Sequence, residues 1–369
     1  MSIVLTEIKE NLGIITINSE KSLNALSLEI VSELKRILEQ WRDNSDIKCI
    51  FLQGAGEKAF CAGGDIRQVR KAIEDYKTID PTQVPPICEE YFITEYSVDY
   101  LIHTYPKPIV VWGDGIVMGG GLGLLAGASH RIVTERSLLA MPEISIGLYP
   151  DVGASYFLNK MPSAYGLYLG LTGTRFDGAD ALFLGIADYF IPSTVKDSIL
   201  DELIQISSSD QLSDKLNTLL AQRSTPSTDL PISQAMLHKS LIATLESIRS
   251  VAEFIAIVEP VAKSDAWVAA GYSFFTKGSP TSVHVIFRQL TESKHYSLEE
   301  VFRSELNLTC QFTVHPDFSE GVRALLIDKD QSPKWTPSTL EQVSNEWIES
   351  HFTPLWSTEE HPFKNIKQA

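Results

Sequence analysis

The sequence predicts an α/β fold followed by a mainly helical C-terminal region. Short apolar runs alternate with helix-type patterns up to about residue 160, an order typical of α/β domains whose strands are largely parallel. Strand patterns then fade, and from residue 233 onward apolar side chains recur mainly at helical spacing. We therefore divide the chain into an α/β core, residues 1–205, and a mainly helical region, residues 206–369.

The first elements follow from local patterns. Residues 3–8 and 14–17 predict two strands of a hairpin around a turn at residues 11–13. Ser27 is suited to cap the helix that follows, because its side-chain oxygen can accept from a free backbone N–H. A short apolar strand at residues 49–52 completes a β-β-α-β unit.

The same alternation continues along the chain. Residues 59–61 predict a strand that runs through a glycine turn into a helix, and residues 91–103 predict another helix. Further strands are predicted at residues 109–112, 131–134 and 137–140. Ser279 followed by Pro280 predicts a helix start, since proline is well tolerated at the first helical position.

Composition argues against several classes of partner. The chain carries 47 acidic and 31 basic side chains, with a formal net charge of −16 and a pI near 5.0. Nucleic acid and anionic membranes would be repelled at long range, so neither is expected as a partner. Residues 108–128 are apolar, but they contain Asp114 and many glycines, which predicts buried core and no membrane span.

The four cysteines are scattered, without a CxxC pattern or a nearby histidine. We expect reduced thiols in a cytoplasmic protein, and neither a disulfide framework nor a zinc ribbon. The first 13 residues have the pattern of neither a secretory signal nor an arginine-rich transit peptide. Metal-binding motifs, a Walker A motif and a Gly-x-Ser-x-Gly elbow are missing from the sequence, so no metal site is predicted.

Residues 113–124 form a glycine-rich passage from a strand into a helix. Without Cβ atoms, the backbone N–H groups at the start of the helix are open to a phosphate or an oxyanion. Close packing of helix and strand would explain the glycines equally. A third interpretation is a dinucleotide fingerprint, Gly121-x-Gly123-x-x-Ala126, with Glu143 following Gly123 by 20 residues.

Residues 60–65 form a second small-residue turn from a strand into a helix. Two such turns can aim N–H groups at one carbonyl oxygen, which is the layout of an oxyanion hole. Farther along, Glu143 and Asp151 lie in a segment that is otherwise nearly all apolar. Buried carboxylates have raised pKa values, which suits general acid–base chemistry, although a helix cap or an arginine pair would also explain them.

These three stretches together resemble the crotonase (enoyl-CoA hydratase/isomerase) superfamily. The resemblance implies a spiral of β-β-α units with a helical C-terminal region. It also implies that the N–H groups of Gly64 and Gly120 hold the thioester oxygen of an acyl-CoA. No cofactor is implied beyond the coenzyme A of the substrate, and a homo-oligomer remains open.

Two departures indicate a branch of the superfamily. A second catalytic glutamate of the hydratases would fall at Gly123, and Asp151 stands where hydratases often have glycine. Glu143 with Asp151 is similar to the pattern of 3-hydroxyisobutyryl-CoA hydrolases. Residues 94–108 resemble the substrate-side helix of that branch, where Glu95 matches a substrate-contacting carboxylate, and residues 317–335 resemble its C-terminal signature.

The resemblance implies hydrolysis of 3-hydroxyisobutyryl-CoA in valine breakdown. Glu143 would act as a base on water or as a nucleophile that forms a transient anhydride, and Asp151 would orient the substrate hydroxyl or serve as an acid. Arg67 is the candidate for the CoA phosphates, or an ordinary solvated helix residue. The alternatives are a hydratase or isomerase that uses Glu143 as a proton shuttle, and a non-catalytic binding or assembly protein.

Overall fold

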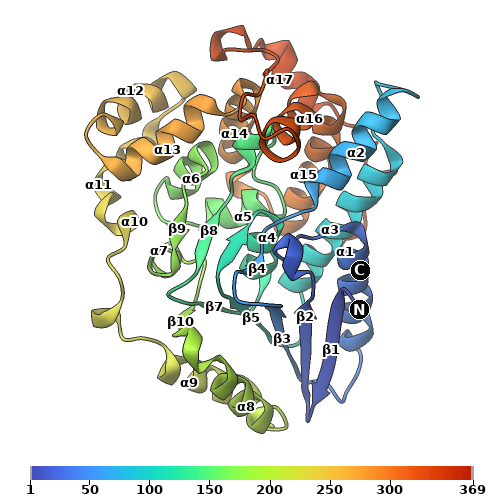
Figure 1. Cartoon of the computed structure of the whole chain (residues 1–369), viewed down its shortest axis with the longest axis vertical. Coiled ribbons are helices and arrows are strands. Elements are labelled where there is room, and N and C mark those ends of the chain that lie inside the picture. Colours follow the sequence, from blue (N-terminus) through green and yellow to red (C-terminus); the bar gives the residue numbers. More distant parts are fainter. Residues whose placement is uncertain (1, 367–369) are drawn as a thin grey trace. The chain divides into compact units, whose positions relative to one another are not determined.

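The computed structural model describes residues 2–366 (Figure 1). The chain divides into two compact units. The first unit comprises Met1–Gly64, Val98–Leu139 and Phe176–Leu237. The second comprises Asp65–Ser97, Ala140–Arg175 and His238–Ala369. These units divide the chain differently from the predicted boundary after residue 205, which lies inside the first unit, and the division into core and helical region stays a prediction.

A six-stranded sheet forms the centre of the first unit, in the order β1-β2-β3-β5-β7-β10. Only β1 and β2 pair antiparallel, and the other neighbours are parallel, as the sequence predicts. The strands are β1 Val4–Lys9, β2 Leu12–Ile17, β3 Cys49–Gly54, β5 Ile109–Gly113, β7 His130–Val133 and β10 Tyr189–Phe190. The hairpin and the strands predicted near residues 50, 110 and 132 are therefore confirmed.

Several helices of the first unit lie against this sheet. Ser27 caps α1 (Leu28–Arg42) by accepting a hydrogen bond from the Ile30 N–H, as predicted. The other helices are α4 Gly120–Gly127, α7 Gly178–Phe183, α8 Lys196–Ile206, α9 Leu212–Arg223 and α10 Gln234–Leu237. Side chains of α8 and α9 share one core with those of β2, β3 and β5, so this pair of helices covers part of the sheet.

A second sheet has the order β4-β6-β8-β9. Its strands are β4 Ala59–Cys61, β6 Ile116–Met118, β8 Leu138–Ala140 and β9 Phe176–Asp177. Strands β4 and β6 run parallel, so the turns that follow them leave the sheet at the same edge. Residues 108–128 form β5, β6 and α4, whose side chains are mostly buried, which confirms the prediction of buried core.

The second unit is helical. Helix α3 (Pro86–His103) passes from it into the first unit. Its other helices are α2 Ile66–Lys77, α5 Ala154–Asn159, α6 Tyr165–Thr172, α11 Lys239–Thr244, α12 Val251–Ala262, α13 Ala266–Lys277, α14 Pro280–Glu292, α15 Leu298–Val314, α16 Pro316–Val322 and α17 Asn345–Phe352. Ser279 caps α14 and Pro280 opens it, as predicted.

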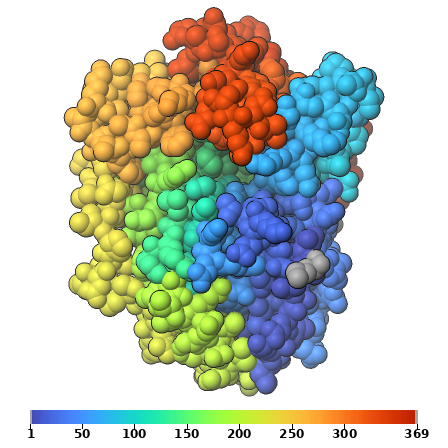
Figure 2. All heavy atoms as spheres, in the orientation of Figure 1, coloured from blue at the N-terminus to red at the C-terminus, as the bar shows by residue number. Residues whose placement is uncertain are grey.

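Atoms of α12 and α13 are exposed on the face drawn in Figure 2. Within residues 2–366, no helix is both long and apolar enough to cross a membrane. All four cysteines are buried and free.

Candidate active site

The first glycine turn follows β4 in the first unit. Gly63 has φ +103°, and a Cβ there would lie 3.1 Å from the Met118 carbonyl oxygen, so glycine suits this position on both counts. The Leu26 N–H donates to the Gly63 carbonyl oxygen at 2.8 Å, which anchors the turn. Gly64 follows directly and ends this segment of the unit.

The second glycine turn joins β6 to α4. Gly119 has φ +51° and precedes Gly120, the first residue of the helix, whose N–H has no acceptor within an α-helix. A Cβ on Gly121 would lie only 2.4 Å from the Cys61 carbonyl oxygen, and one on Gly63 would lie 3.6 Å from the Gly120 nitrogen. The fold therefore brings the two predicted glycine segments side by side within one unit.

Three carboxyl groups gather in the second unit. Glu95 on α3, Glu143 on the 3-10 turn Glu143–Ile146 and Asp151 in the loop before α5 are each 4–6% exposed. Burial raises the pKa of Glu143 well above its usual value, and the charges of Asp151 and Glu95 raise it further. Burial and then the Asp151 charge likewise raise the pKa of Glu95. The structure thus joins three carboxyls from separate segments into one electrostatic cluster.

The simpler explanations for Glu143 and Asp151 do not hold in this cluster. Neither side chain forms an ion pair with an arginine or lysine among the described residues. Glu143 Oε2 is buried without a hydrogen-bond partner in that part of the chain. A buried carboxyl oxygen without a partner is costly, and such costs concentrate at functional sites.

The turn that carries Glu143 is held by the C-terminal segment of the same unit. Gly147 ends the turn with φ +68°, and a Cβ there would lie 2.4 Å from the Asp317 carbonyl oxygen. A Cβ on Gly321 would lie 2.3 Å from the Ile146 carbonyl carbon. Helix α16 therefore packs backbone to backbone on this turn, so the segment that resembles a C-terminal signature supports Glu143.

The loop of Asp151 is strained and braced. Val152 and Gly153 have φ +55° and +83°, and positive φ is costly for a β-branched valine. Glu305 on α15 accepts hydrogen bonds from the N–H groups of Gly153 at 2.7 Å and Ser155 at 2.9 Å. Burial raises the pKa of Glu305 to about 8 and that of Asp151 to about 6. This bracing holds a conformation that the loop sequence alone disfavours.

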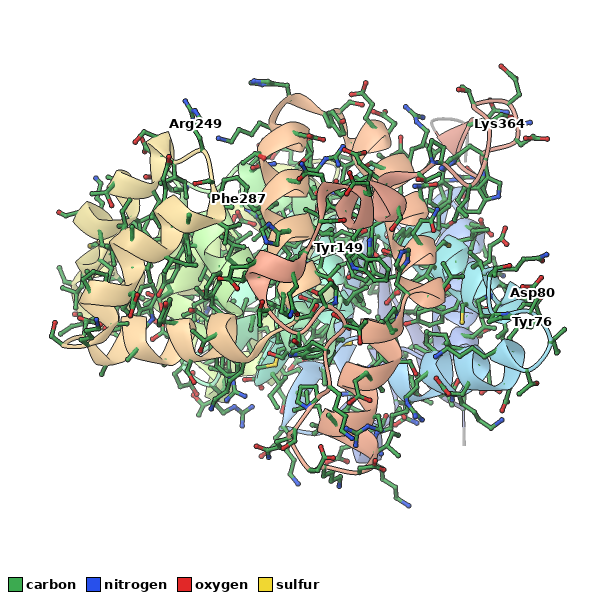
Figure 3. The ribbon with its side chains drawn as sticks, turned by 90° about the horizontal axis from the view of Figure 1, so that it is seen from above. Tyr76, Asp80, Tyr149, Arg249, Phe287 and Lys364 are labelled. Atoms are coloured by element: carbon green, nitrogen blue, oxygen red, sulfur yellow. The ribbon has the colours of Figure 1, made fainter. Side chains whose placement is uncertain are left out.

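Four residues at this site were not predicted: Tyr96, Tyr149, Glu305 and Thr309. The Tyr96 hydroxyl donates to Asp151 Oδ2 at 2.6 Å, which opposes the rise in the Asp151 pKa. Tyr149, which Figure 3 labels among the helices of this unit, is bonded to Thr309. Tyr96 and Tyr149 adjoin predicted residues in sequence, but nothing in the sequence signals that α15 reaches them.

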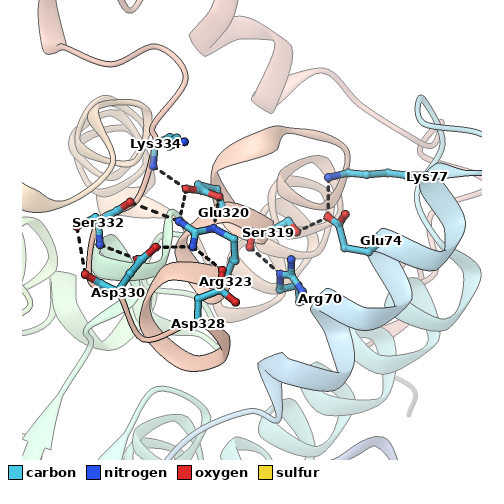
Figure 4. Close-up of polar contacts among 10 residues, drawn as sticks. All are labelled: Arg70, Glu74, Lys77, Ser319, Glu320, Arg323, Asp328, Asp330, Ser332 and Lys334. Carbon is cyan, nitrogen blue, oxygen red and sulfur yellow. Dashed lines mark hydrogen bonds and ion pairs between the residues drawn. The ribbon is translucent and has the colours of Figure 1, made fainter.

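Arg67 lies on the first turn of α2 and is exposed. Figure 4 shows how this helix is fixed to α16: Arg70 Nε donates to the Ser319 carbonyl oxygen at 3.1 Å, and the Ser319 hydroxyl donates to Glu74. The helix therefore holds Arg67 at a defined place in the second unit. Its predicted contact with CoA phosphates stays a prediction.

The same close-up shows a group of polar contacts in the segment that follows α16. The Arg323 guanidinium bonds Glu320, Asp328 and Asp330, and the Lys334 N–H donates to Glu320 at 2.7 Å (Figure 4). Because these five residues lie within 15 positions of the sequence, their bonds tie residues 320–334 into one compact hook. The hook secures the end of the helix that supports the Glu143 turn.

A metal site has no support in this part of the molecule. Among residues 2–366, no group of three or more histidine, cysteine or acidic side chains is arranged to hold an ion. The dinucleotide interpretation also fails on local structure, because Glu143 opens a 3-10 turn after Pro142 and does not end a strand.

The fold and the site define an acyl-CoA enzyme of the crotonase class, and comparison with known proteins agrees. The model of the enoyl-CoA hydratase/isomerase family matches residues 12–352. The chain therefore belongs to the enoyl-CoA hydratase/isomerase family, which confirms the resemblance found in the sequence.

Relatives and solved structures narrow the family. A Danio rerio protein named "3-hydroxyisobutyryl-CoA hydrolase, mitochondrial" is 38% identical over 95% of this chain and 90% of its own length. The Arabidopsis thaliana "3-hydroxyisobutyryl-CoA hydrolase 1" is 36% identical over 95% of this chain and 91% of its own. A Mycobacterium thermoresistibile carnitinyl-CoA dehydratase structure is 30% identical, covers 99% of this chain and all of its own, and has a TM-score of 0.86.

An enoyl-CoA hydratase structure from Rhodobacter sphaeroides is also 30% identical. It covers 96% of this chain and 98% of its own, with a TM-score of 0.83. These two structures confirm the predicted crotonase-type fold with its helical C-terminal region.

Proposed function

We propose that this protein is an acyl-CoA thioester hydrolase that converts 3-hydroxyisobutyryl-CoA and water to 3-hydroxyisobutyrate and CoA. The observation that carries the proposal is the match, at 36–39% identity over nearly the whole chain, to relatives that are named 3-hydroxyisobutyryl-CoA hydrolases. The clustered carboxyls Glu95, Glu143 and Asp151 support it, since hydrolysis needs groups that accept and return a proton. Valine breakdown is the proposed context.

The chemistry divides between backbone and side chains. The N–H groups of Gly64 and Gly120 would stabilise the thioester oxygen as it becomes an oxyanion, a contribution worth roughly 10²–10³ in rate per donor. Glu143 would take a proton from water as hydroxide adds to the carbonyl carbon, or add to that carbon itself and form a transient anhydride that water opens. In both routes the C–S bond breaks and CoA leaves as the thiolate, which then takes up a proton.

Two further residues would bind substrate. Glu95, buried beside Asp151 on α3, would contact the acyl part. Arg67 would meet the CoA phosphates. The net charge of −16 repels CoA at long range, so such local donors must attract it.

A second candidate is hydratase or isomerase activity, favoured by the family and by the titles of the two structural neighbours. An assay of free CoA across a panel of acyl-CoAs separates the candidates. We expect CoA release from 3-hydroxyisobutyryl-CoA, whereas hydration of crotonyl-CoA without CoA release would favour the second candidate. Complete inactivity on the panel would favour a non-catalytic binding or assembly role.

We also propose a cytoplasmic location, which the four free, buried cysteines support because thiols persist in reducing compartments. Several relatives are named mitochondrial, so subcellular fractionation of the full-length chain is the test. Light scattering of the purified protein would decide between a monomer and a homo-oligomer.

A further inference from the structure

A buried chain of hydroxyl groups ends on Asp151. Tyr149 lies 2.8 Å from Thr309 Oγ1, Thr309 Oγ1 lies 2.7 Å from the Tyr96 hydroxyl, and that hydroxyl lies 2.6 Å from Asp151 Oδ2. Tyr96, Tyr149 and Thr309 are at most 1% exposed, and all four residues belong to the second unit. Water therefore does not compete for these hydrogen bonds.

The number of hydroxyl protons determines which group donates in each hydrogen bond. An ionised Asp151 only accepts, so the single hydroxyl proton of Tyr96 points to Oδ2. The Tyr96 oxygen then accepts the single proton of Thr309. The Tyr149 hydroxyl donates to the Glu305 carbonyl oxygen at 2.9 Å and lies 2.8 Å from Thr309 Oγ1. The Tyr96 hydroxyl therefore donates to Asp151 and accepts from Thr309, so both of its hydrogen-bonding functions are used.

Both supports of Asp151 come from one helix. On α15, Glu305 holds the backbone after Asp151, and Thr309, one turn later, holds Tyr96. The loop is thus fixed at its main chain and at its carboxylate. Tyr96 donates to Oδ2, so Oδ1 is the oxygen that we assign to a ligand.

We propose that Tyr96 is a positioning residue whose hydroxyl fixes Asp151 Oδ2, so that Oδ1 accepts a hydrogen bond from the 3-hydroxyl of the substrate. This inference rests on the proposed function and decides between the two roles predicted for Asp151, since an ionised acceptor orients a hydroxyl and does not supply a proton. The Tyr96–Asp151 contact then becomes the determinant of preference for 3-hydroxyacyl thioesters over the same acyl groups without the hydroxyl.

The charges around Asp151 are consistent with this assignment. The titratable groups that interact with it are Glu95 and Tyr96 of α3, Glu143, Tyr149 and Glu305. The pKa of Asp151 is about 6, whereas burial and the charge of Asp151 raise the pKa values of Glu95 and Glu143 well above normal. Above about pH 6, the Asp151 carboxyl is therefore ionised and can accept a hydrogen bond from a substrate hydroxyl.

The test compares Tyr96→Phe with Tyr149→Phe, a matched control that also loses a buried hydroxyl bonded to Thr309 but does not touch Asp151. For each protein, kcat/KM is measured with 3-hydroxyisobutyryl-CoA and with isobutyryl-CoA, across pH 5–9. We expect Tyr96→Phe to lower the preference for the hydroxylated thioester about tenfold, because a hydrogen bond to a charged group is lost. Its acidic limb should move to higher pH, because the Asp151 pKa rises without the donor.

We expect Tyr149→Phe to change the preference and the pH profile much less than Tyr96→Phe, because Tyr149 donates no hydrogen bond to Asp151 and reaches it only through Thr309 and Tyr96. Thr309→Val removes the donor to Tyr96 but leaves Tyr96 in place. It should change the substrate preference and the pH profile in the same direction as Tyr96→Phe, but by a smaller factor. This variant replaces Tyr96→Phe in the test if Tyr96→Phe fails to fold.

Four results would overturn the inference: an unchanged preference in Tyr96→Phe, equal losses on both thioesters, an equal change in Tyr149→Phe, or no shift in either property in a folded Thr309→Val when Tyr96→Phe does not fold. The proposed function fails separately, and this inference with it, if the wild type releases CoA from neither thioester. Thermal unfolding of each variant confirms that folded proteins are compared.

Discussion

The glycine turns of the first unit and the carboxyl cluster of the second unit are built in opposite ways. The turns offer backbone N–H groups, and their shape follows from glycines that stand next to one another in the sequence. The cluster gathers carboxyls from α3, the Glu143 turn and the Asp151 loop, and Glu305 of α15 braces the last of these. Local sequence therefore specifies donors, whereas the acid–base groups depend on long-range packing.

The two regions also carry different energetic costs. Glycine adopts positive φ without steric penalty, so the turns at Gly63 and Gly119 are inexpensive to fold. The cluster holds three buried carboxyls without a cation partner among the described residues, beside a valine at positive φ. Such costs persist where function requires them, so changes in the cluster should trade activity against stability.

The largest effect is expected from Glu143→Gln. Loss of a general base or nucleophile should lower kcat for CoA release by roughly 10³-fold. A carboxyl whose pKa is raised by folding destabilises the folded state increasingly as the pH rises above its unfolded pKa, up to the folded pKa, and this penalty is relieved as the pH falls. Glutamine removes the penalty, so the variant should unfold at a higher temperature than wild type, by a margin that is larger at pH 8 than at pH 6.

Glu359→Gln, at an exposed position, is the control and should change neither quantity. A folded Glu143→Gln protein with wild-type activity would contradict the role of the cluster. A lower unfolding temperature would contradict the proposed trade between activity and stability.

The next effect tests the turns. In Gly121→Ala, the new Cβ would lie 2.4 Å from the Cys61 carbonyl oxygen and force β4 and α4 apart. Overpacking of this kind costs about 1–3 kcal/mol of stability, and misplacing a donor costs about 10² in kcat. Both are measured by denaturant unfolding and by the CoA-release assay.

Gly185→Ala is the control that separates the loss of stability in Gly121→Ala from its loss of activity. Its Cβ would meet nothing within 4 Å, but φ +73° strains alanine, so stability should fall while activity remains. An active Gly121→Ala protein would show that the spacing of the two turns is irrelevant to the reaction.

The same contrast explains what sequence analysis predicted. The parallel strands, the caps at Ser27 and Ser279, and the two glycine turns follow from short-range patterns, and the structure has them. Glu143 and Asp151 stood out as acids in an apolar segment. Tyr96 and Glu305 did not, since their roles depend on α15 packing against residues some 150–210 positions away. A buried glutamate on a helix has no local signature that separates it from a solvated one.

A smaller effect comes from a third kind of region, a buried histidine pair. Burial and the neighbouring His315, stacked at 3.6 Å, lower the pKa of His351 to about 3. Because its unfolded value is near 6.5, only the unfolded chain takes up the proton between about pH 6.5 and 3, so stability falls with acidification, by about 2 kcal/mol at pH 5. Acidification therefore lowers stability through His351, whereas it raises stability through the carboxyl cluster.

Between pH 7 and pH 5, the free energy of unfolding of His351→Leu should therefore fall by about 2 kcal/mol less than that of the wild type. The measurement is the free energy of unfolding at both pH values. His295→Leu, at an exposed histidine, should follow the wild type. Parallel curves for all three proteins would contradict the low pKa of His351.

The smallest effect concerns Arg67, which the sequence predicts to contact the CoA phosphates and which forms no ion pair with any of residues 2–366. Arg67→Ala should raise KM for acyl-CoA about fivefold with kcat unchanged, because an exposed charge pair contributes about 1 kcal/mol to binding and no more in the transition state. Lys71→Ala is the matched control one turn along α2, since Lys71 is exposed and already paired with Asp75. The difference should shrink at high salt, because exposed charges are screened. Equal KM values in both variants would assign Arg67 to the solvated face of α2 and leave the CoA phosphates to other donors.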